Sequence, residues 1–438
     1  MRTDHLKNKL FRLILLISLL LGAGCSPVKG EPASPQPEEI ASGSGRLPAE
    51  PLGERGVSQL VEGNTAFALA MYHQLEDDYD NLFFSPYSIS QALAMTYAGA
   101  RGVTREQMAE TLRFRLEPEE LHSAFNTLDQ TLEKMDEVEL PEDSGDAFQL
   151  NIANTIWGQR DYHFEDPFLD TLANYYGAGL RLLDFIENSE EARGTINSWV
   201  SDQTEGKIQD LIPRGGVGSA TRLVLTNAIY FNASWMEPFD QELTEEGSFF
   251  LLNGEEIQAP MMRHHAAQNF AYGQGENYQV VEIPYVGSQA SMLILLPDEG
   301  NFEEVGRKLD GDYLTQVLES LSPASVNLTF PKFEFESEIS LADTLMEMGM
   351  PSAFGEGADF SGMTGTRDLF ISEVFHKAFV GVDEEGTEAA AATAVVMAES
   401  AMPAEPIRMT VERPFFFLIR DRQTGSILFF GRVLNPLG

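Results

Sequence analysis

The sequence predicts an α+β fold, because patterns typical of helices and of strands both occur along one chain. Apolar residues recur at helical spacing in residues 64–75. Residues 223–231 form a continuous apolar run, as in a buried central strand. Residues 374–383 alternate and are rich in β-branched side chains, as in a strand. The length of 438 residues suggests two or three domains, although one large domain is also compatible with it.

The first 24 residues have the layout of a secretory signal. Basic residues near the start precede a mainly apolar run from Leu10 to Leu21, which is too short to predict a membrane-spanning helix. Small residues then lead to Cys25, the single cysteine. This arrangement resembles the bacterial lipobox, in which the cysteine is acylated and becomes the first mature residue. We therefore expect an extracytoplasmic protein with a lipid anchor at Cys25; the alternative is an ordinary signal peptide with an incidental cysteine.

Residues 25–57 are predicted to be a disordered tether. Prolines recur there among glycine, serine, alanine and glutamate, a composition that favours an extended and mobile chain. Such a tether would hold the folded body off the membrane surface. The chain is thus divided into a signal peptide at 1–24, a tether at 25–57 and a folded domain at 58–438.

Further strands in the body are predicted by alternating or continuous apolar runs. They lie at residues 148–157, 280–285, 291–296, 327–330 and 413–419. The buried run 223–231 contains Asn227, and a buried amide needs hydrogen-bond partners.

Residues 384–403 form a long connection of low complexity between two predicted strands. Its ten residues 389–398 contain no charge, proline or glycine. An extended chain would place Thr387, Ala389 and Ala391 on one face, and such small side chains could slide between two strands. An alanine-rich helix is the alternative, since alanine has the highest helix propensity. The flanking strands favour the extended form, and a connection of this length is usually functional or disordered.

Residues in and around this connection occur in the order and spacing of one protein family. They are the hinge Glu384, Glu385, Gly386, Thr387 and Glu388 with four alanines and Thr393 behind it, His376 and Lys377 before it, and Pro414, Phe415 and residues 431–436 after it. The pattern resembles that of inhibitory serpins, the serine protease inhibitors, over residues 60–438. The resemblance implies one domain with the serpin fold: three β-sheets, about nine helices and an exposed reactive-centre loop.

The resemblance also implies a mechanism, that of a suicide substrate. The target protease attacks the exposed loop and forms its acyl-enzyme. The freed loop then inserts from Thr387 onward as a new strand of the main sheet and distorts the protease, so the native state is metastable. The implied hinge residues are Glu384, Gly386, Thr387, Glu388, Ala389, Ala390, Ala391 and Ala392. Their small, uncharged inserting face predicts the inhibitory type; the alternative is a non-inhibitory serpin-fold binding protein of the cell envelope.

Two polar clusters below the loop are implied in the same way. The shutter, beneath the point where the main sheet opens, comprises Ser85, Ser88, Asn227 and His376. The breach, at the top of that sheet, comprises Trp235 and Lys332. Lys332 is implied to form a salt bridge with Glu384 that pins the base of the loop, whereas two unrelated surface charges would contribute little.

Counting from Gly386 as in similar serpin loops places the reactive bond between Ser400 and Ala401. Met397 and Met402 are the alternative recognised residues. None of these side chains is basic or a large aromatic, which disfavours trypsin-like and chymotrypsin-like targets. Elastase-like or subtilisin-like serine proteases are therefore the expected partners.

Composition and missing motifs exclude other classes of function. The formal charge of -39, with 68 acidic against 29 basic residues, argues against a nucleic-acid partner. No nucleophile elbow, zinc-binding helix motif or phosphate loop occurs, which leaves an envelope hydrolase without a nucleophile. We expect no enzymatic activity, no cofactor, no metal ion and a monomer.

Overall fold

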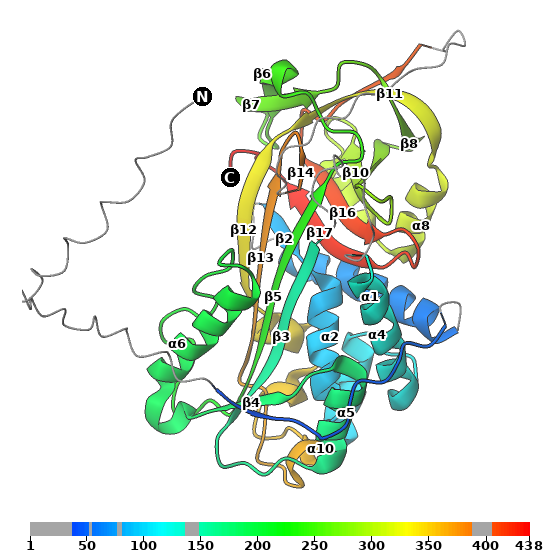
Figure 1. The fold of residues 1–438 in the computed structure, drawn as a ribbon. Coiled ribbons are helices and arrows are strands. Elements are labelled where there is room, and N and C mark those ends of the chain that lie inside the picture. Colours follow the sequence, from blue (N-terminus) through cyan, green and yellow to red (C-terminus); the bar gives the residue numbers. More distant parts are fainter. Residues whose placement is uncertain (1–36, 52–54, 77–80, 136–148, 388–404) are drawn as a thin grey trace, which may run out of the picture. The chain divides into compact units, whose positions relative to one another are not determined.

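The computed structural model describes residues 37–51, 55–76, 81–135, 149–387 and 405–438, all within one compact unit, residues 37–438 (Figure 1). The α-helices of these ranges are α1 (Arg55–Leu75), α2 (Pro86–Tyr97), α3 (Gly102–Thr111), α4 (Pro118–Glu133), α5 (Asp166–Tyr176), α6 (Phe185–Gln203), α7 (Phe302–Lys308), α8 (Gly311–Glu319), α9 (Ala342–Glu347) and α10 (Ser361–Thr364). Two 3₁₀ helices accompany them, η1 (Gln241–Leu243) and η2 (Pro351–Phe354). The helix predicted at 64–75 is confirmed as the second half of α1.

A seven-stranded sheet runs through the middle of the molecule (Figure 1). Its strands are, in spatial order, β1 (Glu38–Ile40), β4 (Leu180–Leu183), β3 (Gln149–Gln159), β5 (Leu223–Ser234), β14 (Gly386–Thr387), β13 (Glu373–Val382) and β12 (Phe333–Ser340). Every residue of β5 is buried, which confirms the strand predicted from its continuous apolar run. β5 and β13 pair directly in parallel, from Val224 with Glu373 to Ile229 with Ala378, and β14 lies between them at one end.

The remaining strands form a ten-stranded sheet. It contains β2 (Leu82–Phe84), β17 (Ile427–Val433), β16 (Phe415–Asp421), β10 (Ala290–Pro297), β9 (Tyr278–Pro284), β8 (Gln268–Gly275), β11 (Ser322–Pro331), β7 (Glu256–Arg263) and β6 (Glu245–Phe250), with β15 (Ile407–Thr410) also paired to β11. The first half of β11 pairs with β8 and its second half with β7 and β15. β11 thus joins two groups of strands: those from β2 to β8 on one side, and β7, β6 and β15 on the other. The described residues therefore form two continuous sheets where three were expected.

The seven-stranded sheet is covered on both faces, because side chains alternate along β5. Val224 and Ala228 pack with the apolar side of α6, including Phe185. Leu225 and Ile229 point the other way, into the main core that also contains residues of α2. Asn227 lies on this second face, between the sheet and α2.

The predicted tether needs one correction. Residues 37–51, inside the range 25–57, are docked on the body instead of being disordered. β1 pairs with β4 at the edge of the seven-stranded sheet, and Arg46 forms ion pairs with α4. Composition did not reveal this, because the strand pairing of β1 and the ion pairs of Arg46 hold the segment, and apolar side chains contribute less. Residues 1–36, with the predicted cleavage site and Cys25, lie outside the described residues.

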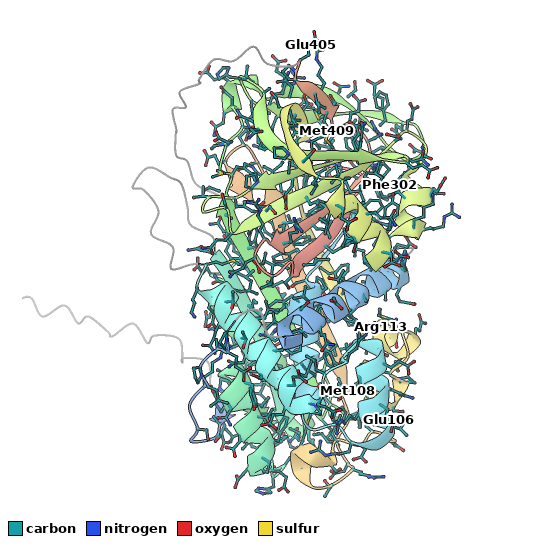
Figure 2. The ribbon with its side chains drawn as sticks, turned by 90° about the vertical axis from the view of Figure 1, so that its right-hand side faces the viewer. Glu106, Met108, Arg113, Phe302, Glu405 and Met409 are labelled. Carbon is teal, nitrogen blue, oxygen red and sulfur yellow. The ribbon has the colours of Figure 1, made fainter. Side chains whose placement is uncertain are left out.

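Figure 2 shows the two ends of the body. Glu405 and Met409, where the chain re-enters after the loop, lie at one end, and Glu106 and Met108 of α3 lie at the other. Within the described ranges, no helix is long and apolar enough to cross a membrane.

Candidate functional site

The chain reverses direction directly after β13. The backbone N–H of Asp383 donates to the carbonyl of Gly386 at 2.9 Å. The Asp383 carboxylate accepts from the backbone N–H groups of Glu385 and Gly386, at 2.9 and 3.2 Å. This turn sends Gly386 and Thr387 back as β14, antiparallel to both β13 and β5. The first residues of the hinge therefore already lie inside the seven-stranded sheet.

Gly386 is required by a close approach of backbones. A Cβ atom at this position would lie 2.2 Å from the carbonyl oxygen of Ala233 and 2.7 Å from Cα of Ser234. Real Cβ atoms do not approach other atoms so closely. Any larger residue would thus push β14 away from β5.

Thr387 is buried against the top of the sheet. Its hydroxyl lies 2.8 Å from the hydroxyl of Tyr285, whose ring stacks on Trp235 with centroids 4.6 Å apart. Trp235 holds the turn from the other side, since its backbone N–H donates to the carbonyl of Glu385 and its indole N–H to that of Asp383. The hydroxyl of Tyr285 and the indole N–H of Trp235 thus find their hydrogen-bond partners in the hinge.

The structure places Lys332 and Glu384 in contact, with Nζ 2.6 Å from Oε2. The Glu384 side chain is 7% exposed and also accepts from the hydroxyl of Thr244 at 2.7 Å. Burial by itself would raise the pKa of Glu384, but the hydrogen bonds from Lys332 and Thr244 outweigh it and lower the pKa below its ordinary value. The base of the loop therefore carries a charged, anchored carboxylate.

The four shutter residues meet at the middle of the same sheet. His376 on β13 and Asn227 on β5 are direct register partners, and His376 Nδ1 is hydrogen-bonded to Asn227 Oδ1. Asn227 donates to the hydroxyl of Ser88 at 2.6 Å. Ser85 donates its backbone N–H to His376 Nε2 at 3.3 Å and caps α2 through its hydroxyl, which accepts from the backbone N–H of Ser88. These bonds cross the junction of β5 and β13.

The shutter is electrically neutral. His376 is fully buried, and this burial lowers its pKa to about 3. One tautomer satisfies both ring nitrogens, with Nδ1 donating to Asn227 and Nε2 accepting from Ser85. No charge therefore has to be compensated at this point of the sheet.

Sequence reasoning missed several partners of these residues. Asn154 on β3 accepts from Asn227 at 2.5 Å and from Ser88 at 3.1 Å, and donates to Gln91 at 2.8 Å. An asparagine inside a predicted strand, like Asn227, was the available signal. Tyr285 and Thr244 gave no signal, because only the folded chain brings them to the hinge.

Other predicted site residues lie outside the described residues. They are Cys25, Glu388, Ala389, Ala390, Ala391, Ala392, Met397, Ser400, Ala401 and Met402. Among the residues that the structure describes, no group of three or more His, Cys, Asp or Glu side chains could hold a metal ion.

Comparisons with known proteins found a matching family, related sequences and similar solved structures. Residues 62–436 match the model of the family described as Serpin (serine protease inhibitor). The leukocyte elastase inhibitor of Sus scrofa is 41% identical over 390 residues, covering 87% of this chain and 100% of that protein. An uncharacterized serpin-like protein of Methanosarcina acetivorans is 37% identical over 383 residues, 86% of each chain. The solved structure of the thermophilic serpin tengpin in its native state has a TM-score of 0.79 and 28% identity, over 91% of this chain and 100% of tengpin.

Proposed function

Because the chain belongs to the serpin family of serine protease inhibitors, we propose that it inhibits a serine protease as a suicide substrate. The protease serine attacks the carbonyl carbon of the reactive residue in the loop. The bond from that carbon to the next nitrogen breaks, the new amine takes a proton, and an acyl-enzyme ester remains. The freed loop then enters the seven-stranded sheet between β5 and β13 and carries the protease with it.

The position of β14 is the observation that carries this proposal. Gly386 and Thr387 already pair with β5 on one side, and Thr387 pairs with Val382 of β13 on the other. The following loop residues are the next ones that would extend β14 along the same gap. Insertion thus continues a strand that has already begun.

Strand direction supplies a driving force. β5 and β13 now pair in parallel, whereas β14 is antiparallel to both. Extending β14 would replace one parallel ladder with two antiparallel ladders, and antiparallel pairing is slightly more stable per residue. The small side chains on the inserting face would enter without desolvating a charge.

We place the reactive bond between Ser400 and Ala401, with Met397 and Met402 as alternatives. Their side chains fit elastase-like or subtilisin-like proteases. The similarity to leukocyte elastase inhibitors of several vertebrates supports an elastase-like target.

Incubation with a panel of elastase-like and subtilisin-like proteases tests the proposal. We expect an SDS-resistant complex, and mass spectrometry of the released C-terminal peptide will identify the cleaved bond. Cleavage in the loop should also raise the melting temperature sharply. A non-inhibitory binding protein would instead leave the protease active and melt at nearly the same temperature after cleavage.

We also propose that Cys25 is acylated and anchors the mature protein in the cell envelope, because small residues precede it after a short apolar run. Mass spectrometry of the mature N-terminus tests this directly. A diacylglyceryl mass on Cys25 is expected, and a free thiol there would exclude the anchor.

A further inference from the structure

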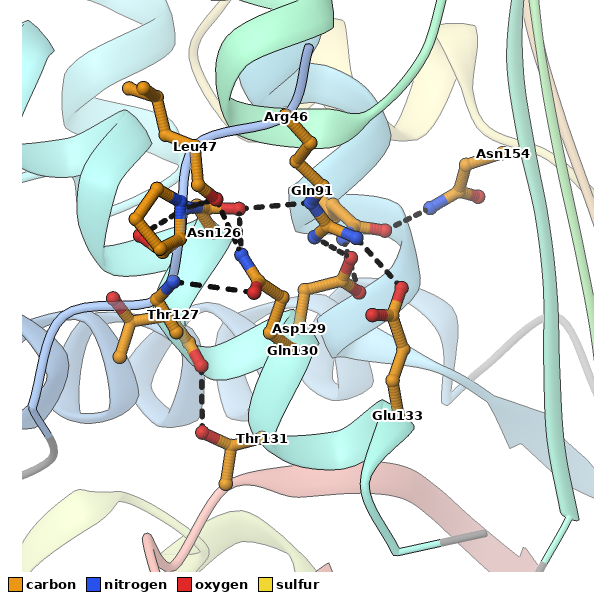
Figure 3. A network of polar contacts seen from close by, with 12 residues as sticks. Arg46, Leu47, Gln91, Asn126, Thr127, Asp129, Gln130, Thr131, Glu133 and Asn154 are labelled. Carbon is orange, nitrogen blue, oxygen red and sulfur yellow. Dashed lines mark hydrogen bonds and ion pairs between the residues drawn. The ribbon is translucent and has the colours of Figure 1, made fainter. Parts of the chain in front are cut away.

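The N-terminal strap, which we define as residues 37–51, is bonded to β4, α5 and α4, and its contacts with β4 and α4 carry the argument here. At one end, β1 pairs with β4, and Glu39 forms an ion pair with Arg181 at 2.7 Å. At the other end, the strap lies along α4 (Figure 3). There the amides of Asn126 and Gln130 donate to the carbonyl of Leu47, at 3.1 and 2.9 Å.

Arg46 is the centre of the second attachment. Its guanidinium donates to Asp129 at 2.5 Å, to Glu133 at 2.8 Å and to the side-chain oxygen of Asn126 at 2.9 Å (Figure 3). The Arg46 and Asp129 side chains are 21% and 15% exposed, whereas that of Glu133 is 59% exposed. The pair with Asp129 is therefore the more strongly desolvated of the two.

Asp129 connects the strap to the interior. Its other carboxylate oxygen accepts from Gln91 of α2 at 2.8 Å and from the hydroxyl of Tyr87 at 2.9 Å. Gln91 in turn accepts from Asn154 on β3 at 2.8 Å, and Asn154 accepts from Asn227. Asn227 bonds His376. An unbroken relay of hydrogen bonds thus runs from Arg46 to the shutter; its members are Arg46, Asp129, Gln91, Asn154, Asn227 and His376.

The relay and the strap resist the same movement. Entry of the loop requires β5 to part from β13, and β3, β4 and β1 are hydrogen-bonded in series to β5. This half of the sheet must then shift over α2 and α4. The strap ties its outer edge to α4 through β1, and the relay ties its centre to α2 and α4 through Asn154 and Gln91. The relay depends on Asp129 keeping its present position, and Asp129 is also the more buried partner of Arg46 in the strap.

We propose that the N-terminal strap is an intramolecular restraint on sheet opening, acting through Arg46 and the relay to hold the shutter closed until the loop is cleaved. The proposal rests on the proposed function, in which the loop inserts into this sheet. Loss of Arg46 leaves the carboxylate of Asp129 poorly solvated and unpaired, so it must turn towards water and release Gln91. The strap therefore slows the spontaneous insertion of an uncleaved loop.

The experiment uses the full chain and its Arg46→Ala variant. Each is warmed below its melting temperature, and conversion to the loop-inserted form is followed as gain of resistance to urea and loss of inhibition. We expect conversion to be about tenfold faster in Arg46→Ala, equivalent to about 1.4 kcal/mol in the barrier. Lys308→Ala, which removes an exposed ion pair with Glu304, is the matched control and should convert at the wild-type rate. Should Arg46→Ala fail to fold, Arg46→Gln, which keeps the stem and one donor, takes its place.

A double variant separates the relay from simple attachment of the strap. Gln91→Leu breaks the relay while the bonds of Arg46 to Asp129 and Glu133 remain. We expect Gln91→Leu to speed conversion and the further change Arg46→Ala to add little to it. If the two increases in conversion rate multiply in the double variant, Arg46 does not act through the relay.

Two outcomes overturn different statements. If cleaved wild-type protein becomes more heat-resistant but Arg46→Ala converts no faster than Lys308→Ala, the strap is no restraint and the proposed function stands. If cleavage gives no gain in heat resistance, the proposed function fails. Hydrogen exchange at the backbone amides of Asn227 and His376 then still tests whether the strap restrains the sheet. If it does, exchange is faster in Arg46→Ala than in wild type; unchanged exchange would exclude the restraint.

Discussion

The hinge and the shutter both bury polar groups at the seven-stranded sheet, but they do so in different electrical states. The hinge holds a charged carboxylate, Glu384, paired with Lys332 near the surface. The shutter holds a neutral imidazole and neutral amides, with His376 fully buried. The ion pair of Lys332 and Glu384 lies near the surface, so its two charges can separate and be solvated. A neutral cluster in the interior can be parted without leaving an unpaired buried charge, which would be far more costly.

The largest effect is expected for Thr387→Arg, which puts a charge at the entrance where the structure has a buried hydroxyl. The arginine would have to be buried beside Tyr285, so insertion should fail and the protein should become a substrate. We expect the yield of SDS-resistant complex to fall by more than about tenfold, because burying an unpaired guanidinium costs several kcal/mol. Thr315→Arg, an exposed position on α8, is the matched control; stable complexes formed by Thr387→Arg would contradict the model of a tightly filled hinge.

Gly386→Ala tests the steric side of the hinge. The new Cβ must displace the backbone of Ala233, so we expect the native state to lose about 3 kcal/mol, within the range for overpacking. Urea unfolding of the uncleaved protein measures this loss. Gly355→Ala, which meets no atom within 4 Å, should change stability little, and equal stability of the two variants would contradict the close approach at β14.

Acid should weaken the shutter. His376 is neutral when folded, with a pKa of about 3, but titrates near 6.5 when unfolded. The unfolded chain therefore binds more protons as the pH falls from 6.5 towards 3, and the native state loses stability over that window. At pH 5 this loss is about 2 kcal/mol. Urea unfolding at pH 7 and pH 5 should show a smaller decrease in His376→Gln than in wild type; identical decreases would mean that His376 is charged when folded.

The smallest effect is expected for Lys332→Ala. Lys332 is 36% exposed, so solvent screens part of its interaction with Glu384, and we expect a loss of about 1 kcal/mol. The pKa of Glu384 should rise, because its main charged partner is gone. The double variant Lys332→Ala with Glu384→Gln should recover part of the loss in urea unfolding, and full additivity of the two changes would show that the pair contributes nothing.

Much of the fold could be predicted because its signals are local. The continuous apolar run became β5 and the alternating run became β13, within a few residues of the predicted limits. The hinge was recognised as a motif, and the structure gives a steric reason for its glycine, Gly386. The joining of the sheets through β11 was not predicted, since pairing between strands far apart in the chain leaves no local pattern.

The relay also combines a residue that the sequence could single out with partners that it could not place. Asn227 could be singled out as a polar residue in a buried strand, but its partners Asn154 and Gln91 come from segments whose positions only folding sets. The strap was misjudged because its composition is that of a mobile chain, whereas its order depends on hydrogen-bond donors and acceptors supplied by α4 and β4.

The amino-acid sequence by itself determined which segments are helices and strands, that a glycine and a run of small residues follow β13, and that Asn227 needs partners. Tertiary structure alone decided which groups satisfy that need, that β14 already lies between β5 and β13, and that residues 37–51 are bound to the body. The physical reason is that backbone propensity and side-chain size act between neighbours in the chain, whereas hydrogen bonds and ion pairs of buried groups depend on which distant residues the fold brings within about 3 Å.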